Sequence, residues 1–263
     1  MRLKDKVAII TGAGDGFAAA IAAGYAKEGA KLYLQEFEDR ADKLENTVAD
    51  VRKQGAAVAS GVHDITRAEP IKALVKAVLA QYGQIDILVN TTEGGWHGVL
   101  FSATEDNWNR AIDRGLKAYY FMCQQVGKEM ARRGQGKIIN LTSIVGRIGA
   151  GGAVIWGAAR GGVDAMTAAL AQDLGQYGIH CVGLARGATE GTNYSPAARA
   201  ERLRRLPFGR LGRAEDVVGP AIFLAGPESE WVTGSVLYCD GGYVTAAATD
   251  DEFRPKEKPY RGP

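Results

Sequence analysis

The sequence has few cysteines and almost no excess of charge. Cys123, Cys181 and Cys239 are scattered without the spacing of metal ligands, and isolated cysteines in odd number are typical of a reducing cytoplasm. Lys and Arg number 32 against 30 for Asp and Glu, a net charge of +2, which argues against nucleic acid or a membrane surface as a partner. We therefore expect a cytoplasmic protein with no metal site.

A long apolar run is also absent. No segment approaches the roughly 18 apolar residues that a membrane-spanning helix needs, and the chain does not open with the pattern of a signal peptide. With 46% hydrophobic and 24% charged residues, the 263-residue chain has the composition of a globular protein and enough length for a sizeable core. One large domain is the simplest expectation.

Short apolar runs alternate with helical patterns, which indicates a parallel sheet covered on both faces. We predict a single doubly wound α/β domain over residues 1–245, with about seven strands, and a polar tail at 246–263. Ser102-x-x-Glu105 is a capping-box pattern that is expected to open a long helix ending near Arg133. The apolar runs begin near positions 7, 31, 57, 85, 137, 180 and 232.

A Gly-rich turn follows the first apolar run. Gly12 and Gly16 lie between that run and an Ala-rich helical pattern, where glycines let the backbone approach a pyrophosphate at the helix N-terminus. Glu36 comes just past the second run, 36 − 12 = 24 residues after Gly12, where a carboxylate can bind an adenosine ribose and disfavour a 2′-phosphate. This arrangement favours NAD over NADP. The alternative is that Glu36 only begins a solvated helix.

Residues 137–163 have the layout of a reactive centre. Their apolar strand ends at Ser143, a Gly-rich loop follows, and a helix then carries Trp156 and Arg160 four residues apart, on one face. In an open α/β sheet, sites form beyond the carboxyl ends of the strands. Ser143 is therefore a candidate site residue, together with the two positions on the helix.

These motifs resemble the short-chain dehydrogenase/reductase family over roughly residues 3–244. Thr-Gly-x-x-x-Gly-x-Ala at 11–18 is similar to the Gly-rich turn of the family, and Trp-Val-Thr-Gly at 231–234 with Asp-Gly-Gly at 240–242 resembles its closing motif. The resemblance implies a Rossmann fold that binds NAD. It also implies that Asp64, beside Ile65, contacts adenine and that Asn90 borders the cofactor.

The resemblance implies a catalytic set that this chain has lost in part. The family's Ser is followed thirteen residues later by a Tyr and four residues further on by a Lys, and an Asn on the preceding long helix completes the set. Ser143 is kept, but Trp156 and Arg160 stand at the Tyr and Lys positions, and Gly115 stands at the Asn position. Tryptophan has no accessible ionisation and arginine stays protonated, so standard hydride transfer is not expected.

The cofactor motifs have also changed. Asp15 and Glu93 add carboxylates near the expected cofactor, and Arg186 replaces a proline that usually lies by the nicotinamide. Ala18 stands where the family's third glycine usually lies. Together these changes predict that NAD binds weakly or not at all. We expect Trp156 and Arg160 to have a structural role, with the guanidinium of Arg160 packed over the indole of Trp156 at about 6 Å or less.

Three functions remain open. The first is a non-catalytic subunit in a homo- or hetero-oligomer with an active relative, because some family dehydrogenases that act on hydroxyacyl thioesters pair an active with an inactive subunit. The second is an enzyme that uses the pocket for non-redox chemistry, similar to a lyase or dehalogenase. The third is an NAD(H)-dependent oxidoreductase with a substitute proton donor. Acid–base candidates for the second function are Glu93, His97, Tyr119, Tyr120 and Tyr194.

Overall fold

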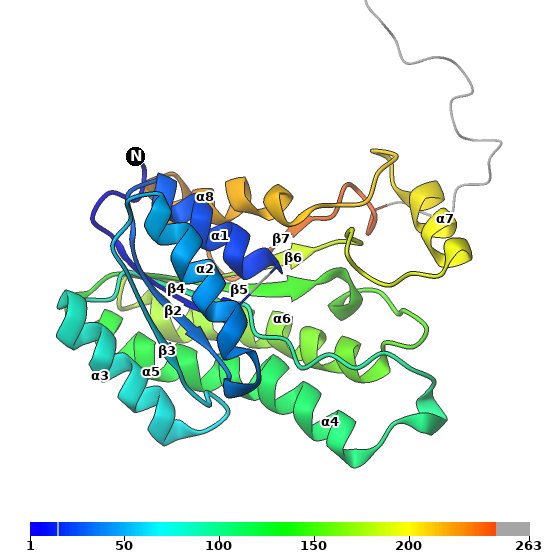
Figure 1. Cartoon of the computed structure of the whole chain (residues 1–263), viewed down its shortest axis with the longest axis horizontal. Helices are drawn as coiled ribbons and strands as arrows, with labels where there is room; N and C mark the ends of the chain where they lie inside the picture. Colours follow the sequence, from blue (N-terminus) through cyan, green and yellow to red (C-terminus); the bar gives the residue numbers. More distant parts are fainter. Residues whose placement is uncertain (15, 246–263) are drawn as a thin grey trace, which may run out of the picture.

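The computed structural model describes residues 1–14 and 16–245 and consists of one seven-stranded sheet with helices on both faces (Figure 1). The strand order is β3-β2-β1-β4-β5-β6-β7, and every neighbouring pair is parallel. The predicted doubly wound α/β fold is confirmed. The strands are β1 (Val7–Thr11), β2 (Lys31–Glu36), β3 (Val58–Val62), β4 (Ile87–Asn90), β5 (Gly136–Ser143), β6 (Ile179–Arg186) and β7 (Val236–Cys239).

The apolar strands form two cores, one on each face of the sheet. Strand β1 is buried along its whole length, as expected for a central parallel strand with helices on both faces. Helices α1, α2 and α8 cover one face, and α3, α5 and α6 cover the other (Figure 1). The helices are α1 (Gly16–Lys27), α2 (Ala41–Lys53), α3 (Ala68–Tyr82), α4 (Glu105–Ile112), α5 (Ala118–Arg133), α6 (Val154–Gly175), α7 (Pro196–Arg205) and α8 (Val218–Ala225).

The predicted start of the long helix is wrong by two residues. Thr104 is the N-cap, because its hydroxyl accepts a hydrogen bond from the backbone N–H of Asn107 at 3.2 Å, while the Asn107 side chain accepts from the backbone N–H of Thr104 at 3.0 Å. The long helix also contains a π-helical segment, η3 (Asp113–Lys117), between α4 and α5. Short 3-10 turns are η1 (Glu38–Arg40), η2 (Leu100–Ser102), η4 (Ile144–Gly146), η5 (Ala214–Val217) and η6 (Pro227–Ser229).

The order in which strands are added to the sheet reverses at β1. From this strand the chain first runs outward to β2 and β3, and then returns to β4 on the opposite side. A crevice forms at such a switch point, beyond the carboxyl ends of the strands. The topology therefore brings the Gly-rich turn after β1, the loop after β4, and the ends of β5 and β6 to one edge. Two predictions concern residues outside the described ones: the polar tail at 246–263, and a carboxylate of Asp15 near the cofactor.

Candidate functional site

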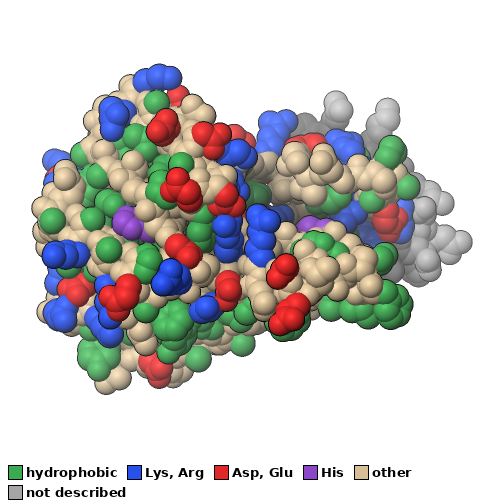
Figure 2. Space-filling view, turned by 60° about the horizontal axis from the view of Figure 1, so that its bottom comes forward, with side chains coloured by type: hydrophobic (Ala, Val, Ile, Leu, Met, Phe, Trp, Pro, Cys, Tyr) green, Lys and Arg blue, Asp and Glu red, His purple; other side chains and the backbone are tan. Residues whose placement is uncertain are grey.

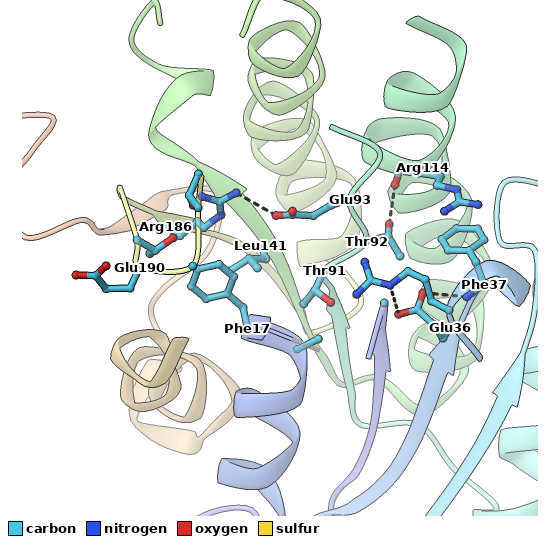
Figure 3. A pocket seen from close by; sticks show the side chains of 17 residues that line it. Phe17, Glu36, Phe37, Thr91, Thr92, Glu93, Arg114, Leu141, Arg186 and Glu190 are labelled. Atoms are coloured by element: carbon cyan, nitrogen blue, oxygen red, sulfur yellow. Dashed lines mark hydrogen bonds and ion pairs between the residues drawn. The ribbon is translucent and has the colours of Figure 1, made fainter. Parts of the chain in front are cut away.

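A cavity of about 370 Å³ lies at this edge (Figure 3). Its walls come from the Gly-rich turn, the end of β2, the loop after β4, strand β5 and the loop after β6. Gly12 and Gly16 have φ angles of 63° and 61°, which L side chains rarely adopt. A Cβ at Gly12 would also lie 3.0 Å from the Cα of Thr92. Glycine is thus required for the close approach of this turn to the loop after β4.

Glu36 holds the Gly-rich turn against the end of β2. The structure places Glu36 as the last residue of β2 rather than just past it, and only 2% of it is exposed. Its carboxylate accepts hydrogen bonds from the backbone N–H groups of Gly14 and Phe37, both at 2.9 Å, and lies 3.6 Å from Nε of Arg40. The carboxylate that was predicted to bind ribose thus lines the cavity and is also tied to the backbone on two sides.

Arg186 crosses the opposite end of the cavity (Figure 3). Its Nη2 lies 3.2 Å from Oε1 of Glu93, and its guanidinium lies 5.2 Å from the ring centre of Phe17. The Glu93 side chain is 42% exposed; partial desolvation acts to raise its pKa, but the cationic groups of Arg186 and Arg160 outweigh it and hold that pKa below its usual value. Arg186 thus connects β6, helix α1 and the loop after β4.

Trp156 and Arg160 are buried side by side in α6. They are 2% and 1% exposed, and Cζ of Arg160 lies 3.9 Å from the indole centre, so the expected stacking is present. Nη1 of Arg160 donates to Oη of Tyr119 at 2.8 Å and to the carbonyl of Leu141 at 3.0 Å. Its Nη2 donates to the carbonyl of Thr92 at 2.9 Å. The guanidinium therefore ties α6 to α5, β5 and the loop after β4.

The indole of Trp156 fills the space next to Gly115. A Cβ at Gly115, in the π segment, would lie 3.8 Å from Cζ3 of the indole and 3.5 Å from Cβ of Ala159. On another side, a Cβ at Gly95 would lie 2.9 Å from Cε3 of the same ring. Single π turns inside helices are frequent at functional sites. Here the residue at that turn has no side chain, and the space is occupied by Trp156.

Ser143 and the candidate acid–base groups differ in their surroundings. Ser143 is 2% exposed, and its hydroxyl accepts a hydrogen bond of 3.5 Å from the backbone N–H of Val145. His97 lies near the indole, with ring centres 6.4 Å apart, and desolvation together with the charge of Arg186 lowers its pKa. Burial raises the pKa of Tyr119, which faces the site, whereas Tyr120 is 44% exposed.

Three residues proposed for the cofactor lie outside the cavity lining. The carboxylate of Asp64 accepts hydrogen bonds from Thr66 within its own turn, and Ile65 is buried in the core. The amide of Asn90 is buried and donates to Oδ1 of Asn140 at 2.9 Å.

Sequence reasoning missed Arg40 and Arg114, which do line the cavity. Arg114 forms a two-pronged ion pair with Asp39, at 2.9 and 3.1 Å, and its guanidinium lies 4.1 Å from the ring centre of Phe37. The position of Arg114 next to Gly115, in a motif already singled out, is the signal that could have found it.

The strand order and the switch-point cavity define a Rossmann-type α/β protein. The family model described as "Enoyl-(Acyl carrier protein) reductase" matches residues 12–244. The chain belongs to the short-chain dehydrogenase/reductase family.

Named relatives cover nearly the whole chain. The 3-oxoacyl-[acyl-carrier-protein] reductase FabG of Thermotoga maritima is 34% identical, over 93% of this chain and 100% of the relative. The (2S)-[(R)-hydroxy(phenyl)methyl]succinyl-CoA dehydrogenase subunit BbsD of Thauera aromatica is 32% identical, over 92% and 98%. The solved gluconate 5-dehydrogenase from Burkholderia cenocepacia, in complex with NADP and tartrate, is 30% identical with a TM-score of 0.88, over 94% and 98%.

The described residues also bear on metals and membranes. Within 1–14 and 16–245, no group of three or more His, Cys, Asp or Glu side chains is placed to hold a metal ion. In the same residues, no helix is long and apolar enough to cross a membrane. Figure 2 shows positive and negative side chains interspersed over one face, with a hollow near its middle.

Proposed function

We propose that this chain is a non-catalytic subunit that assembles with an active short-chain dehydrogenase/reductase. One observation carries the proposal: Trp156 and Arg160, which the resemblance predicts to stand at the family's Tyr and Lys positions, are buried as a stacked pair. The partner is proposed to supply the catalytic set and to act on a substrate bound as a thioester.

The chemistry of the site supports a loss of hydride transfer. Interconversion of an alcohol and a carbonyl needs a group that exchanges a proton with the substrate oxygen. The indole N–H of Trp156 has no accessible ionisation, and the guanidinium of Arg160 stays charged. The hydroxyl of Tyr119 donates to the carbonyl of Leu141 at 2.9 Å and accepts from Arg160, and burial raises its pKa. This hydroxyl is therefore used within the core.

Exposed apolar side chains support an assembled state. They lie on or beside the helices and the closing strand through which family members usually pair. Trp231 is fully exposed just before β7, and Leu237 is 38% exposed on β7, an edge strand of the sheet. On the helical side, Trp108, Tyr120 and Tyr177 are 48%, 44% and 46% exposed. We propose that a partner subunit covers these side chains.

The names of two relatives support the thioester class and the subunit role. FabG of Thermotoga maritima is named for an acyl-carrier-protein substrate, and BbsD of Thauera aromatica is named as a subunit of a CoA-ester dehydrogenase. The runner-up function is a divergent NAD(H)-dependent oxidoreductase. It is favoured by the open cavity and the retained turn at Gly12 and Gly16.

The test is reconstitution of the complete assembly. The tagged chain is purified from cells that produce it naturally, the associated dehydrogenase is identified by mass spectrometry, and the two chains are combined and assayed with a hydroxyacyl thioester and NAD. Ser143→Ala in this chain should leave kcat within a factor of about 2, because its centre is not used. The corresponding Ser→Ala in the partner should remove most of the activity, since removal of such groups typically costs 10²-fold or more. Turnover by this chain alone, lost in Ser143→Ala, would contradict the proposal.

A further inference from the structure

We propose that the cavity binds a single adenosine diphosphate group and that Arg186 closes the part of the cleft that a second nucleoside would need. The ligand class is therefore an adenosine diphosphate without nicotinamide. The inference does not depend on whether the chain is catalytic, because it concerns the shape and charge of the cleft.

The phosphate position is set by the Gly-rich turn and helix α1. The backbone N–H groups of Gly12, Ala13 and Gly14 are already bound to Gln35 and Glu36, so we assign the phosphate contact to the first turn of helix α1, at the cavity wall. Helix α1 is 12 residues long and begins at Gly16, which also lines the cavity. The N-terminus of such a helix favours an anion through its N–H groups and its dipole.

The end of the cavity near β2 suits an adenosine. Glu36 lies there, with oxygen atoms that can accept a hydrogen bond from a ribose hydroxyl in addition to the two backbone bonds that they already accept. Arg40 and Arg114 line the same end, and planar guanidinium groups stack well on ring systems. Their charges are balanced by Glu36 and Asp39, so this end is polar without a strong net charge.

Three side chains cross the opposite end, and a second cavity of about 480 Å³ shares Phe17, Arg186 and Thr189 with this one. A dinucleotide lies across the switch point, so its second nucleoside extends from the pyrophosphate toward the ends of β5 and β6. Arg186 is the last residue of β6, and it reaches across this path to Glu93 at 3.2 Å and over the ring of Phe17 at 5.2 Å. The side chain of Arg186 is only 15% exposed. A nicotinamide would have to break this contact and displace a largely buried cation.

The size of the cavity agrees with one nucleoside. Ligand pockets usually span about 300–1,000 Å³, and 370 Å³ is at the small end of that range. The residues present thus fit the adenosine half of the family cofactor and do not fit its nicotinamide half. Trp156, which is buried beside the loop after β4, adds to this misfit because it fills the adjoining reaction centre.

The test is calorimetric titration of the full chain with ADP, ADP-ribose, NAD and CoA. We expect ADP to bind and NAD to bind no more tightly than ADP. CoA contains an adenosine diphosphate group with an additional 3′-phosphate, which the carboxylate of Glu36 would repel, so tighter binding of CoA than of ADP would assign the site to a thioester ligand, and the reverse would assign it to a free nucleotide. No binding of ADP, or binding of NAD at least 10-fold tighter than ADP, would overturn the inference.

Two variants test the role of Arg186 directly. Arg186→Ala should improve the affinity for NAD relative to ADP by about 10-fold, because the contact across the cleft is removed. Glu93→Gln keeps the size of the side chain and breaks only the ion pair, so it should change the ratio of the NAD and ADP affinities in the same direction. This variant provides the test if Arg186→Ala folds poorly. Arg132→Ala is the matched control, since Arg132 forms an exposed ion pair with Glu129 on α5. Unchanged ratios in both test variants would contradict the role of Arg186.

Discussion

The switch-point cavity, where we propose nucleotide binding, and the candidate reaction centre at Trp156 and Arg160 lie at the same edge of the sheet and differ in what fills them. The cavity keeps about 370 Å³ of space, and its shape depends on the backbone of a Gly-rich turn. The reaction centre contains a stacked indole and guanidinium, both almost fully buried. The cavity thus depends on backbone conformation, whereas the space beside it is filled by buried side chains.

The largest expected effect concerns the tryptophan of the reaction centre. Trp156→Ala should lower the free energy of unfolding by about 4 kcal/mol, because removal of a buried aromatic side chain leaves a cavity. Urea denaturation followed by circular dichroism measures this change. Trp231→Ala is the control, since Trp231 is fully exposed in the structure. A loss below about 1 kcal/mol at Trp156 would show that the reaction centre is not packed as core.

Arg160→Ala should cost slightly less, about 3 kcal/mol. The change removes three charge-assisted hydrogen bonds, and it leaves the carbonyls of Thr92 and Leu141 without that donor in a buried region. The same urea titrations measure the loss. Arg132→Ala, an exposed arginine on α5, should change stability by less than about 0.5 kcal/mol. Equal effects in the two variants would argue against a structural role for Arg160.

Two glycines of the Gly-rich turn, Gly12 and Gly16, give a matched pair of variants at the cavity. Gly12→Ala places a Cβ in a left-handed conformation and 3.0 Å from the backbone of Thr92, so it should cost about 2–3 kcal/mol. Gly16→Ala has a similar φ, but its Cβ has no neighbour within 4 Å, so it should cost only about 1 kcal/mol. Thermal unfolding of both variants measures the difference. A larger loss at Gly16 would contradict the close packing of the turn.

A smaller effect is expected in the pH dependence of stability. The pKa of Glu93 is lowered in the folded protein, so its ionised form contributes stability above the unfolded pKa of about 4.3. This contribution is lost as the pH falls through the lower, folded pKa. Compared with Glu93→Gln, the wild type should therefore lose more thermal stability between pH 5 and pH 3, as scanning calorimetry can measure. Parallel curves would show that the ion pair with Arg186 is weak.

The fold was predictable because local apolar runs determine it, and the family resemblance reinforced the same answer. The start of the long helix was not, because Ser102 and Thr104 both suit an N-cap and the sequence pattern does not select between them. Hydrogen bonds between residues far apart in the sequence could not be predicted either. The carboxylate of Glu36 turns back to the Gly-rich turn, and Asn90 joins a buried network with Asn140. Arg186 contacts Glu93, a partner 93 residues away along the chain.

The most direct test of the account is the double substitution Trp156→Tyr with Arg160→Lys, which returns the family residues to both positions. Reduction of a 3-oxoacyl thioester is measured with NADH, and folding of the variant is checked by circular dichroism. We predict no turnover above the wild type, because Gly115, where the resemblance predicts the family's Asn, has no side chain and Arg186 still crosses the cleft to Glu93. An increase of 100-fold or more would show that the centre is intact apart from two side chains, and would contradict the central claim that it has become part of the core.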